Sequence, residues 1–213
     1  MYIRDYMKTP VITVTKDTLV DDALRIMYEK KVRRLPVIEG GKLVGLVTRR
    51  LLSEAVPESP MPLSIWGAHY QLSKMRVQNV MKTDIITITP DTTVEAAATL
   101  AEQHKIGTLP VVDKKHNLVG IITGTDLYHL LTQVLGFGKT GVRLHIKAGT
   151  KDIQQLQILE IMIRHKVNVL SAFPTKPAST QQEGFIIHLD TKNAGAIVED
   201  LKKLGLSVEE QSH

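Results

Sequence analysis

Thr123 and Asp126 are the two side chains of this 213-residue chain whose spacing most directly suggests chemistry. They stand three residues apart, directly after an apolar run and at the expected start of a helix. A carboxylate at a helix start is stabilised by the helix dipole, and it can accept hydrogen bonds from two vicinal hydroxyls such as those of a ribose. The same Thr-x-x-Asp spacing also forms a capping box, in which the side chains only satisfy backbone N–H groups. The spacing alone leaves both interpretations open.

Basic side chains near the start of the chain favour an anionic ligand. Residues 1–52 contain 11 Lys and Arg against 6 Asp and Glu, so the whole net charge of +5 lies there. Arg33 and Arg34 follow an expected helix, and Arg49 follows Thr48 at the start of the next one. Guanidinium groups and helix N-termini are both suited to phosphate oxygens. The alternative is that the basic residues at this helix end only complement the helix dipole.

An internal repeat places these residues in the first two thirds of the chain. The matching segments, at an offset of 74 or 75 residues, are Met-Lys-Thr at 7–9 and 81–83, Leu-Pro-Val at 35–37 and 109–111, and Leu-Val-Gly at 43–45 and 118–120. Two copies in the same order with a single gap indicate a paired module rather than a solenoid. In this alignment Thr48 corresponds to Thr123, and Leu51 stands where the second copy has Asp126.

Each copy is expected to fold as strand–helix–strand–strand–helix, with a β-rich run such as 11–14 at its start. Apolar residues at i, i+3, i+4 and i+7 predict one helix in each copy, at Val20, Ala23, Leu24 and Met27 and at Val94, Ala97, Ala98 and Ala101. Thr92 and Glu95 have the spacing of a capping box at the start of the second of these helices. Gly40-Gly41, between two apolar runs, predicts a tight hairpin turn.

The remaining residues follow a different plan. Strands are expected at 142–146, 167–173, 185–189 and 206–208, and helices at 153–165 and 194–201. In the first of these helices, the predicted apolar face consists of Ile153, Leu156, Leu159 and Ile163. The order βαββαβ is the ferredoxin-like plan. The expected domains are therefore 1–56, a linker with a short helix at 57–75, 76–132, and 142–210.

The composition argues against several classes of function. The chain has no cysteine, so we expect neither disulfides nor a thiolate metal site. The first residues lack the apolar stretch of a signal peptide, and no run approaches the roughly 18 apolar residues of a membrane span, so we expect a cytoplasmic protein without membrane contact. Walker and dinucleotide loops, a nucleophile elbow and His-x-x-x-His spacing are all missing, so we expect neither catalysis nor a metal ion. The lack of aromatic residues between the basic ones argues against a nucleic acid partner.

The repeat resembles the CBS domain, and two in tandem resemble a Bateman module. The residues that carry the resemblance are the Leu-Pro-Val segment of each copy and the closing segment Gly120–Asp126, which reads Gly-Ile-Ile-Thr-Gly-Thr-Asp. By element order, the last part resembles an ACT domain, and the whole chain resembles the acetoin utilisation proteins of the AcuB type. The expected fold class is therefore α/β (α+β), with two CBS repeats and a ferredoxin-like βαββαβ domain of ACT type.

The resemblance implies an adenine nucleotide or other adenosyl ligand, such as AMP or ATP, whose ribose contacts Thr123 and Asp126. The implied adenine slot consists of Ile85, Ile86, Thr108, Leu109 and Pro110. The implied phosphate contacts are Arg33, Arg34, Thr48 and Arg49. Because Leu51 cannot accept hydrogen bonds from ribose hydroxyls, we expect one adenosyl site per chain.

The function that the resemblance implies is a non-catalytic regulatory sensor without a cofactor, related to acetoin or acetate metabolism. The ACT-like domain would transmit ligand binding to an unidentified regulated protein, and the small residues at Ala97, Ala98 and Ala101 would allow close helix approach in a homodimer. The alternative is a ligand-free scaffold or dimerisation protein whose ACT-like domain binds a partner or an amino acid. The loop at 147–151 lacks the Pro-Gly pair that is usual in amino-acid-binding ACT domains.

Overall fold

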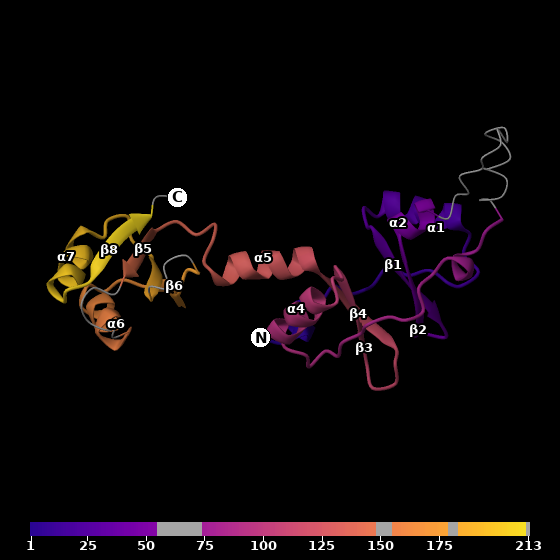
Figure 1. The fold of residues 1–213 in the computed structure, drawn as a ribbon, viewed down its shortest axis with the longest axis horizontal. Coiled ribbons are helices and arrows are strands. Elements are labelled where there is room, and N and C mark those ends of the chain that lie inside the picture. Colours follow the sequence, from indigo (N-terminus) through magenta and orange to yellow (C-terminus); the bar gives the residue numbers. More distant parts are fainter. Residues whose placement is uncertain (55–73, 148–154, 179–182, 212–213) are drawn as a thin grey trace. The chain divides into compact units, whose positions relative to one another are not determined.

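The chain divides into two compact units, Met1–Leu127 and Tyr128–His213 (Figure 1). The computed structural model describes residues 1–54, 74–147, 155–178 and 183–211. Both units combine helices and sheets, which confirms the predicted α/β fold class. Most of the linker predicted at 57–75, with its short helix, lies outside the described residues, as does most of the loop at 147–151.

The first unit contains the same elements twice. The first repeat contains η1 (Ile3–Asp5), α1 (Val20–Glu29), β1 (Arg34–Glu39), β2 (Lys42–Thr48) and α2 (Arg49–Glu54). The second repeat contains η2 (Val77–Asn79), α4 (Val94–Gln103), β3 (Thr108–Val112), β4 (Leu118–Thr123) and α5 (Gly124–Val134). Strands β1 and β2 form one antiparallel hairpin and β3 and β4 another. Gly40 and Gly41 make the turn of the first hairpin with φ of +56° and +83°, a region open to glycine without steric cost.

The predicted amphipathic helices form, with small differences at their ends. Val20, Ala23 and Met27 of α1 are buried, as are Val94 and Ala97 of α4, whereas Ala98, which was predicted on the same face of α4, is exposed. Helix α4 begins one residue later than expected, so the prediction that Thr92 caps it is wrong. Its cap is Thr93, whose Oγ1 accepts a hydrogen bond from the backbone N of Ala96 at 3.2 Å. The strand expected at 11–14 is reduced to a single parallel bridge between Val14 and Val37.

The start of each repeat packs against the other repeat. Lys8 forms an antiparallel bridge with Ile121 of β4, and the equivalent Lys82 forms one with Leu46 of β2. The backbone N of Ile3 likewise donates to the carbonyl of Thr92, at 2.9 Å. Lys8 is equivalent to Lys82, and Ile121 is equivalent to Leu46. Each repeat therefore makes the same bridge to the other repeat, and the two repeats are related by an approximate twofold axis. The chain therefore crosses between the repeats after Lys8, and again after Lys82.

The second unit is a four-stranded antiparallel sheet with two helices. Its elements are β5 (Val142–Lys147), α6 (Gln155–Arg164), β6 (Val169–Thr175), β7 (Gly184–Leu189), α7 (Gly195–Lys203) and β8 (Ser207–Gln211). The strand order β6-β7-β5-β8 is the order that the ferredoxin-like βαββαβ plan requires. Alternate residues of β5, namely Val142, Leu144 and Ile146, point into a core shared with α6 and α7.

The predicted inner face of α6 is wrong. Leu156, Leu159 and Ile163 are 77%, 37% and 75% exposed, whereas Ile158, Ile161 and Met162 are buried. Helix α6 has apolar residues on two neighbouring faces, so its sequence does not identify the face that the sheet covers. Ile153, the fourth residue of the predicted face, lies outside the described residues.

Candidate functional site

The candidate site begins where β4 ends and α5 starts. Thr123 Oγ1 donates a hydrogen bond to Asp126 Oδ2 at 2.6 Å, and the backbone N of Thr123 donates to the same oxygen at 2.9 Å. The backbone N of Asp126 donates to Thr123 Oγ1 at 3.4 Å. These reciprocal contacts are a capping box, so without a ligand the pair already satisfies the backbone at the helix start.

Lys8 holds the other carboxylate oxygen of Asp126. Its Nζ lies 2.6 Å from Oδ1, and the Asp126 side chain is 16% exposed whereas that of Lys8 is 66% exposed. Burial by itself would raise the pKa of Asp126, but the hydrogen bonds from Lys8 and Thr123 outweigh it and lower that pKa below its usual value. At neutral pH, therefore, the site contains a partly buried, charged carboxylate at a helix N-terminus.

A cavity of about 300 Å³ lies beside this pair, and we call it the Thr123 cavity. Asp126 is bonded to two of its lining residues, Lys8 and Thr123. Its apolar lining comes from the segment where the chain crosses between the repeats, from the residues that follow α1 and from β4: Pro10, Val11, Ile12, Val32 and Ile121. Its cationic lining includes Arg33 and Arg34 of the first repeat. The cavity thus combines an apolar slot with guanidinium groups, while the Asp126 carboxylate, which is not itself among the lining residues, is bonded to two residues that are.

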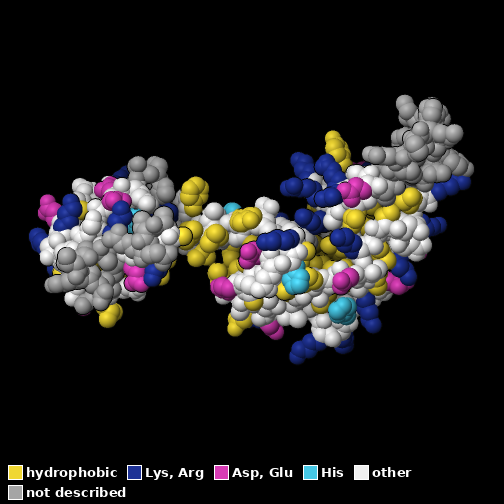
Figure 2. All heavy atoms as spheres, in the orientation of Figure 1, with side chains coloured by type: hydrophobic (Ala, Val, Ile, Leu, Met, Phe, Trp, Pro, Cys, Tyr) yellow, Lys and Arg dark blue, Asp and Glu magenta, His cyan; other side chains and the backbone are white. Residues whose placement is uncertain are grey.

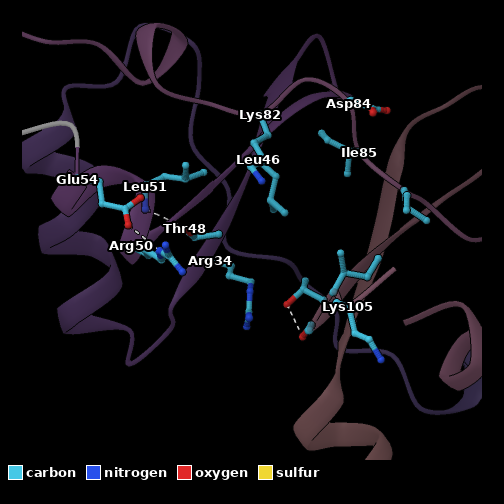
Figure 3. Close-up of a pocket in the computed structure, with 14 residues that line it drawn as sticks. Arg34, Leu46, Thr48, Arg50, Leu51, Glu54, Lys82, Asp84, Ile85 and Lys105 are labelled. Carbon is cyan, nitrogen blue, oxygen red and sulfur yellow. Dashed lines mark hydrogen bonds and ion pairs between the residues drawn. The ribbon is translucent and has the colours of Figure 1, made fainter. Parts of the chain in front are cut away.

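A second cavity, of about 500 Å³, lies at the equivalent position of the first repeat, and we call it the Leu51 cavity (Figure 3). Its apolar lining comes from both repeats: Leu46, Leu51, Ile85, Ile86 and Ile106. Arg34, Arg50, Lys82 and Lys105 contribute cations, while Glu54 is held by Arg50, with Nε 2.6 Å from Oε1. Thr48 Oγ1 accepts a hydrogen bond from the backbone N of Leu51 at 3.1 Å. Half of a capping box therefore persists here, without the carboxylate.

The structure separates Ile85 and Ile86 from the Thr123 and Asp126 pair, so their predicted grouping is wrong. Both isoleucines line the Leu51 cavity, because the start of each repeat crosses to the other repeat. The equivalent residues Val11 and Ile12 lie beside Thr123 instead. The repeat alignment contained this equivalence, but nothing in it showed that the chain crosses over. Lys8 was missed for the same reason.

The other predicted site residues are distributed over both cavities. Thr108 lines both, whereas Leu109 and Pro110 are buried and line neither. Among the predicted phosphate contacts, Arg33 lines the Thr123 cavity, Thr48 lines the Leu51 cavity, and Arg34 lines both. Arg49 is exposed and lines neither. Figure 2 shows dark blue Lys and Arg side chains gathered on the part of the first unit that carries α1 and α2.

Among the residues that the structure describes, no three His, Asp or Glu side chains come together as a candidate metal site. In the same ranges no helix has the length and apolar composition needed to span a membrane.

Comparison with protein families matches this chain to the CBS domain. The CBS domain model matches residues 3–58 and 77–133, which together make up more than half of the chain. A homoserine O-acetyltransferase of Methanococcoides burtonii is 35% identical over 130 residues, which are 61% of this chain and 24% of that protein. The chain thus spans about a quarter of the length of the first relatives it matches.

Solved structures similar to this chain include CBS pairs. The acetoin utilisation protein AcuB of Vibrio cholerae has a TM-score of 0.55 at 29% identity, covering 64% of this chain and 93% of that one. CBSX2 of Arabidopsis thaliana in complex with AMP has a TM-score of 0.53 at 30% identity, covering 63% and 98%. The CBS pair of protein MJ0100, in complex with 5′-methylthioadenosine and S-adenosyl-L-methionine, has a TM-score of 0.52 at 25% identity, covering 62% and 95%.

Proposed function

Since this chain belongs to the CBS-domain family, we propose that it is a non-catalytic regulatory sensor that binds an adenosyl ligand in the Thr123 cavity. The observation that carries the proposal is the charged carboxylate of Asp126 at the start of α5, bonded to two residues of a cavity that also has an apolar slot and two arginines. The AMP and adenosyl complexes of similar CBS pairs support this ligand class.

The proposed mode of binding makes use of the capping box. Asp126 accepts three hydrogen bonds, two at Oδ2 and one at Oδ1, out of about four that a carboxylate can accept. For two ribose hydroxyls to bind to Asp126, one of its three present donors must therefore leave the carboxylate. Lys8 is the donor that leaves most easily, because its side chain is 66% exposed and water can solvate its ammonium group once the contact breaks. The adenine would then pack against Val11 and Ile12, with Arg33 and Arg34 facing the phosphate.

The second unit, in this proposal, is an ACT-like domain that transmits ligand binding to an unidentified regulated protein. Its βαββαβ order and its sheet order support the assignment. Helix α5 begins at the capping box in the first unit and ends in the second, so it is the proposed transmitting element. The proposed domains remain 1–56, 76–132 and 142–210, and the similarity to AcuB supports a role in acetoin or acetate metabolism.

The test is calorimetry with adenosine, AMP and 2′,3′-dideoxyadenosine on wild type and Asp126→Asn. One site per chain is expected, and the substitution should weaken adenosine and AMP by roughly ten- to a hundredfold, since hydrogen bonds to charged groups contribute about 1.5–3 kcal/mol. Dideoxyadenosine should bind weakly to both proteins. Asp84→Asn is the matched control, because it removes a carboxylate from the Leu51 cavity instead. Unchanged affinity in folded Asp126→Asn would return Asp126 to a purely structural role.

A second candidate function is a ligand-free scaffold or dimerisation protein whose second unit binds a partner or an amino acid. The observation that favours it is the closed capping box of Asp126, together with Leu51 at the equivalent position. The same calorimetry separates the two candidates, because a scaffold would bind none of the three adenosyl compounds.

A further inference from the structure

Arg34 breaks the approximate symmetry of the two repeats. It is the first residue of β1 and pairs with Thr48 of β2. The equivalent first residue of β3 is Thr108, which pairs with Thr123 of β4. The two strand starts are therefore alike in backbone pairing, but only one of them has a long cationic side chain.

Gly107 makes room for that side chain in the second repeat. A Cβ atom placed on Gly107 would lie 2.8 Å from Arg34 Nη2 and 3.5 Å from its Cζ. Gly107 is the equivalent of Arg33, so the second repeat has a glycine where the first has an arginine. The Arg34 guanidinium consequently reaches across from one repeat to the other.

In that position Arg34 lines both the Thr123 cavity and the Leu51 cavity. Figure 3 shows it extending from the first repeat into the Leu51 cavity, with Lys105 of the second repeat on the other side. No carboxylate pairs with Arg34 among the residues that the structure describes. Burial, and then the neighbouring charge of Arg33, lower the pKa of Arg34 from its usual value, so the charged form has lost hydration without gaining a partner.

We propose that Arg34 is a single anion-binding group shared by the two cavities, so that an anion bound in one weakens the binding of an anion in the other. For a nucleotide in the Thr123 cavity, this inference rests on the proposed function. The guanidinium forms short, directed hydrogen bonds to phosphate oxygens, and one guanidinium cannot align with phosphates on both sides at full strength. Adenosine has no phosphate to bind Arg34, so it should not change anion binding in the Leu51 cavity.

The cavities can be observed separately in one experiment, because each has isoleucine methyl groups in its lining. Ile12 and Ile121 report on the Thr123 cavity, and Ile85 and Ile106 report on the Leu51 cavity. The full-length protein with ¹³C-labelled isoleucine methyls is titrated with pyrophosphate, first alone and then with saturating AMP or adenosine. Chemical shifts of the two reporter pairs give two separate dissociation constants.

With pyrophosphate alone, Arg34→Ala should weaken binding at both reporter pairs by about tenfold. Two matched variants remove a cation from one cavity only. Arg33→Ala should weaken binding at Ile12 and Ile121, and Lys82→Ala at Ile85 and Ile106. An effect of Arg34→Ala at one reporter pair or at neither would overturn the proposal. So would a Leu51 cavity that does not respond to pyrophosphate.

With AMP bound, the pyrophosphate affinity at Ile85 should fall about fivefold or more in wild type, and with adenosine it should not change. Arg34→Ala should abolish this difference between the AMP-bound and the adenosine-bound protein. Gly107→Ala keeps the charge but forces the flexible guanidinium away, and it should reduce the difference as well. A difference that persists in Arg34→Ala would mean direct repulsion between the two anions and would overturn the proposal.

The same titrations test the adenosyl site and the shared role of Arg34 separately. If neither AMP nor adenosine shifts Ile12 and Ile121, the adenosyl site is refuted, and the titration with pyrophosphate alone still decides whether Arg34 serves both cavities. If both ligands shift these methyls and the coupling is absent, the adenosyl site stands and the inference is refuted.

Discussion

Lys8 Nζ lies 2.6 Å from Asp126 Oδ1, so the start of the first repeat is joined to the closing helix of the second. This ion pair exists because Lys8 forms a bridge to Ile121 of β4 rather than to a strand of its own repeat. In the proposed mode of binding, a ribose hydroxyl takes the place of Lys8 at the same carboxylate oxygen. Lys8 is therefore a competitor for the group that the ligand needs.

Replacing Lys8 should tighten the binding of adenosine. Lys8→Met removes the donor at Asp126 Oδ1 and leaves the capping box intact, so a ribose hydroxyl no longer has to displace it. The affinity should rise by about two- to tenfold, because a hydrogen bond from an exposed donor to this partly buried carboxylate contributes about 0.5–1.5 kcal/mol. Calorimetry with adenosine on wild type, Lys8→Met and the equivalent Lys82→Met measures this. Weaker adenosine binding in Lys8→Met would show that Lys8 contacts the ligand instead of competing with it.

Leu51→Asp should add a second nucleoside site. The backbone N of Leu51 already donates to Thr48 Oγ1 at 3.1 Å, so an aspartate here can complete the capping box. The new carboxylate would stand at a helix N-terminus beside a cavity of about 500 Å³ that Ile85 and Ile86 line. Calorimetric stoichiometry for adenosine should rise from one to two per chain. Leu51→Asn, which has the size without the charge, should remain at one.

Two glycines should resist substitution because a methionine from the other repeat lies on each. A Cβ on Gly120 would overlap Met7 Sδ and lie 2.9 Å from its Cγ, and a Cβ on Gly45 would overlap Met81 Sδ. Gly120→Ala and Gly45→Ala should each lower the free energy of unfolding by about 1–3 kcal/mol, the usual cost of overpacking. Gly124→Ala is the control, since nothing lies within 4 Å of its added methyl. Denaturant unfolding of the three variants measures the difference, and equal stabilities would contradict the contact.

Acid should remove the contribution of Asp200 to the stability of the second unit. Hydrogen bonds from Lys203, at 2.8 Å, and from His165, at 2.9 Å, lower the pKa of Asp200 from 3.8 to about 2. A carboxylate whose pKa is lower in the folded state stabilises fully above the unfolded value and progressively less as the pH falls towards 2. Wild type should therefore exceed Asp200→Asn in stability at pH 5, and the difference should shrink between pH 4 and pH 2. Chemical unfolding followed at the buried Met162 methyl tests this, and a difference independent of pH would refute it.

The proposed homodimer can be assigned to a surface with two variants. Ala98 of α4 is exposed, which keeps the predicted close helix approach possible, while Leu156 and Ile163 form an exposed apolar stripe on α6. Light scattering should show a dimer for wild type and a monomer for Ala98→Glu, because a carboxylate cannot enter a close helix contact without a partner. A dimer that persists in Ala98→Glu and is lost in Ile163→Glu would move the interface to α6. A wild-type monomer at every salt concentration would refute the homodimer.

Local patterns determined the elements and the fold class. The i, i+3, i+4, i+7 spacing of α1 and the glycines at 40–41 act between near neighbours in the chain, where propensity and side-chain periodicity are decisive. The contacts between Thr123 and Asp126 are local in the same sense, because a spacing of three residues at the start of a helix determines their geometry. The capping contacts followed from the spacing, whereas the ligand of the pair remains a proposal.

The tertiary structure decided which residues meet across the repeats. The exchange of the repeat starts places Val11 and Ile12 beside Thr123, and it places Ile85 and Ile86 in the Leu51 cavity. It also brings Lys8 to Asp126, and the packing of the two repeats brings Arg34 to Gly107. The tertiary structure likewise decided which of the two apolar faces of α6 is buried against the sheet. Alternative long-range contacts can be equally compatible with the local sequence. Only the packing of the core and the pairing of the strands make one set of contacts more stable than the others.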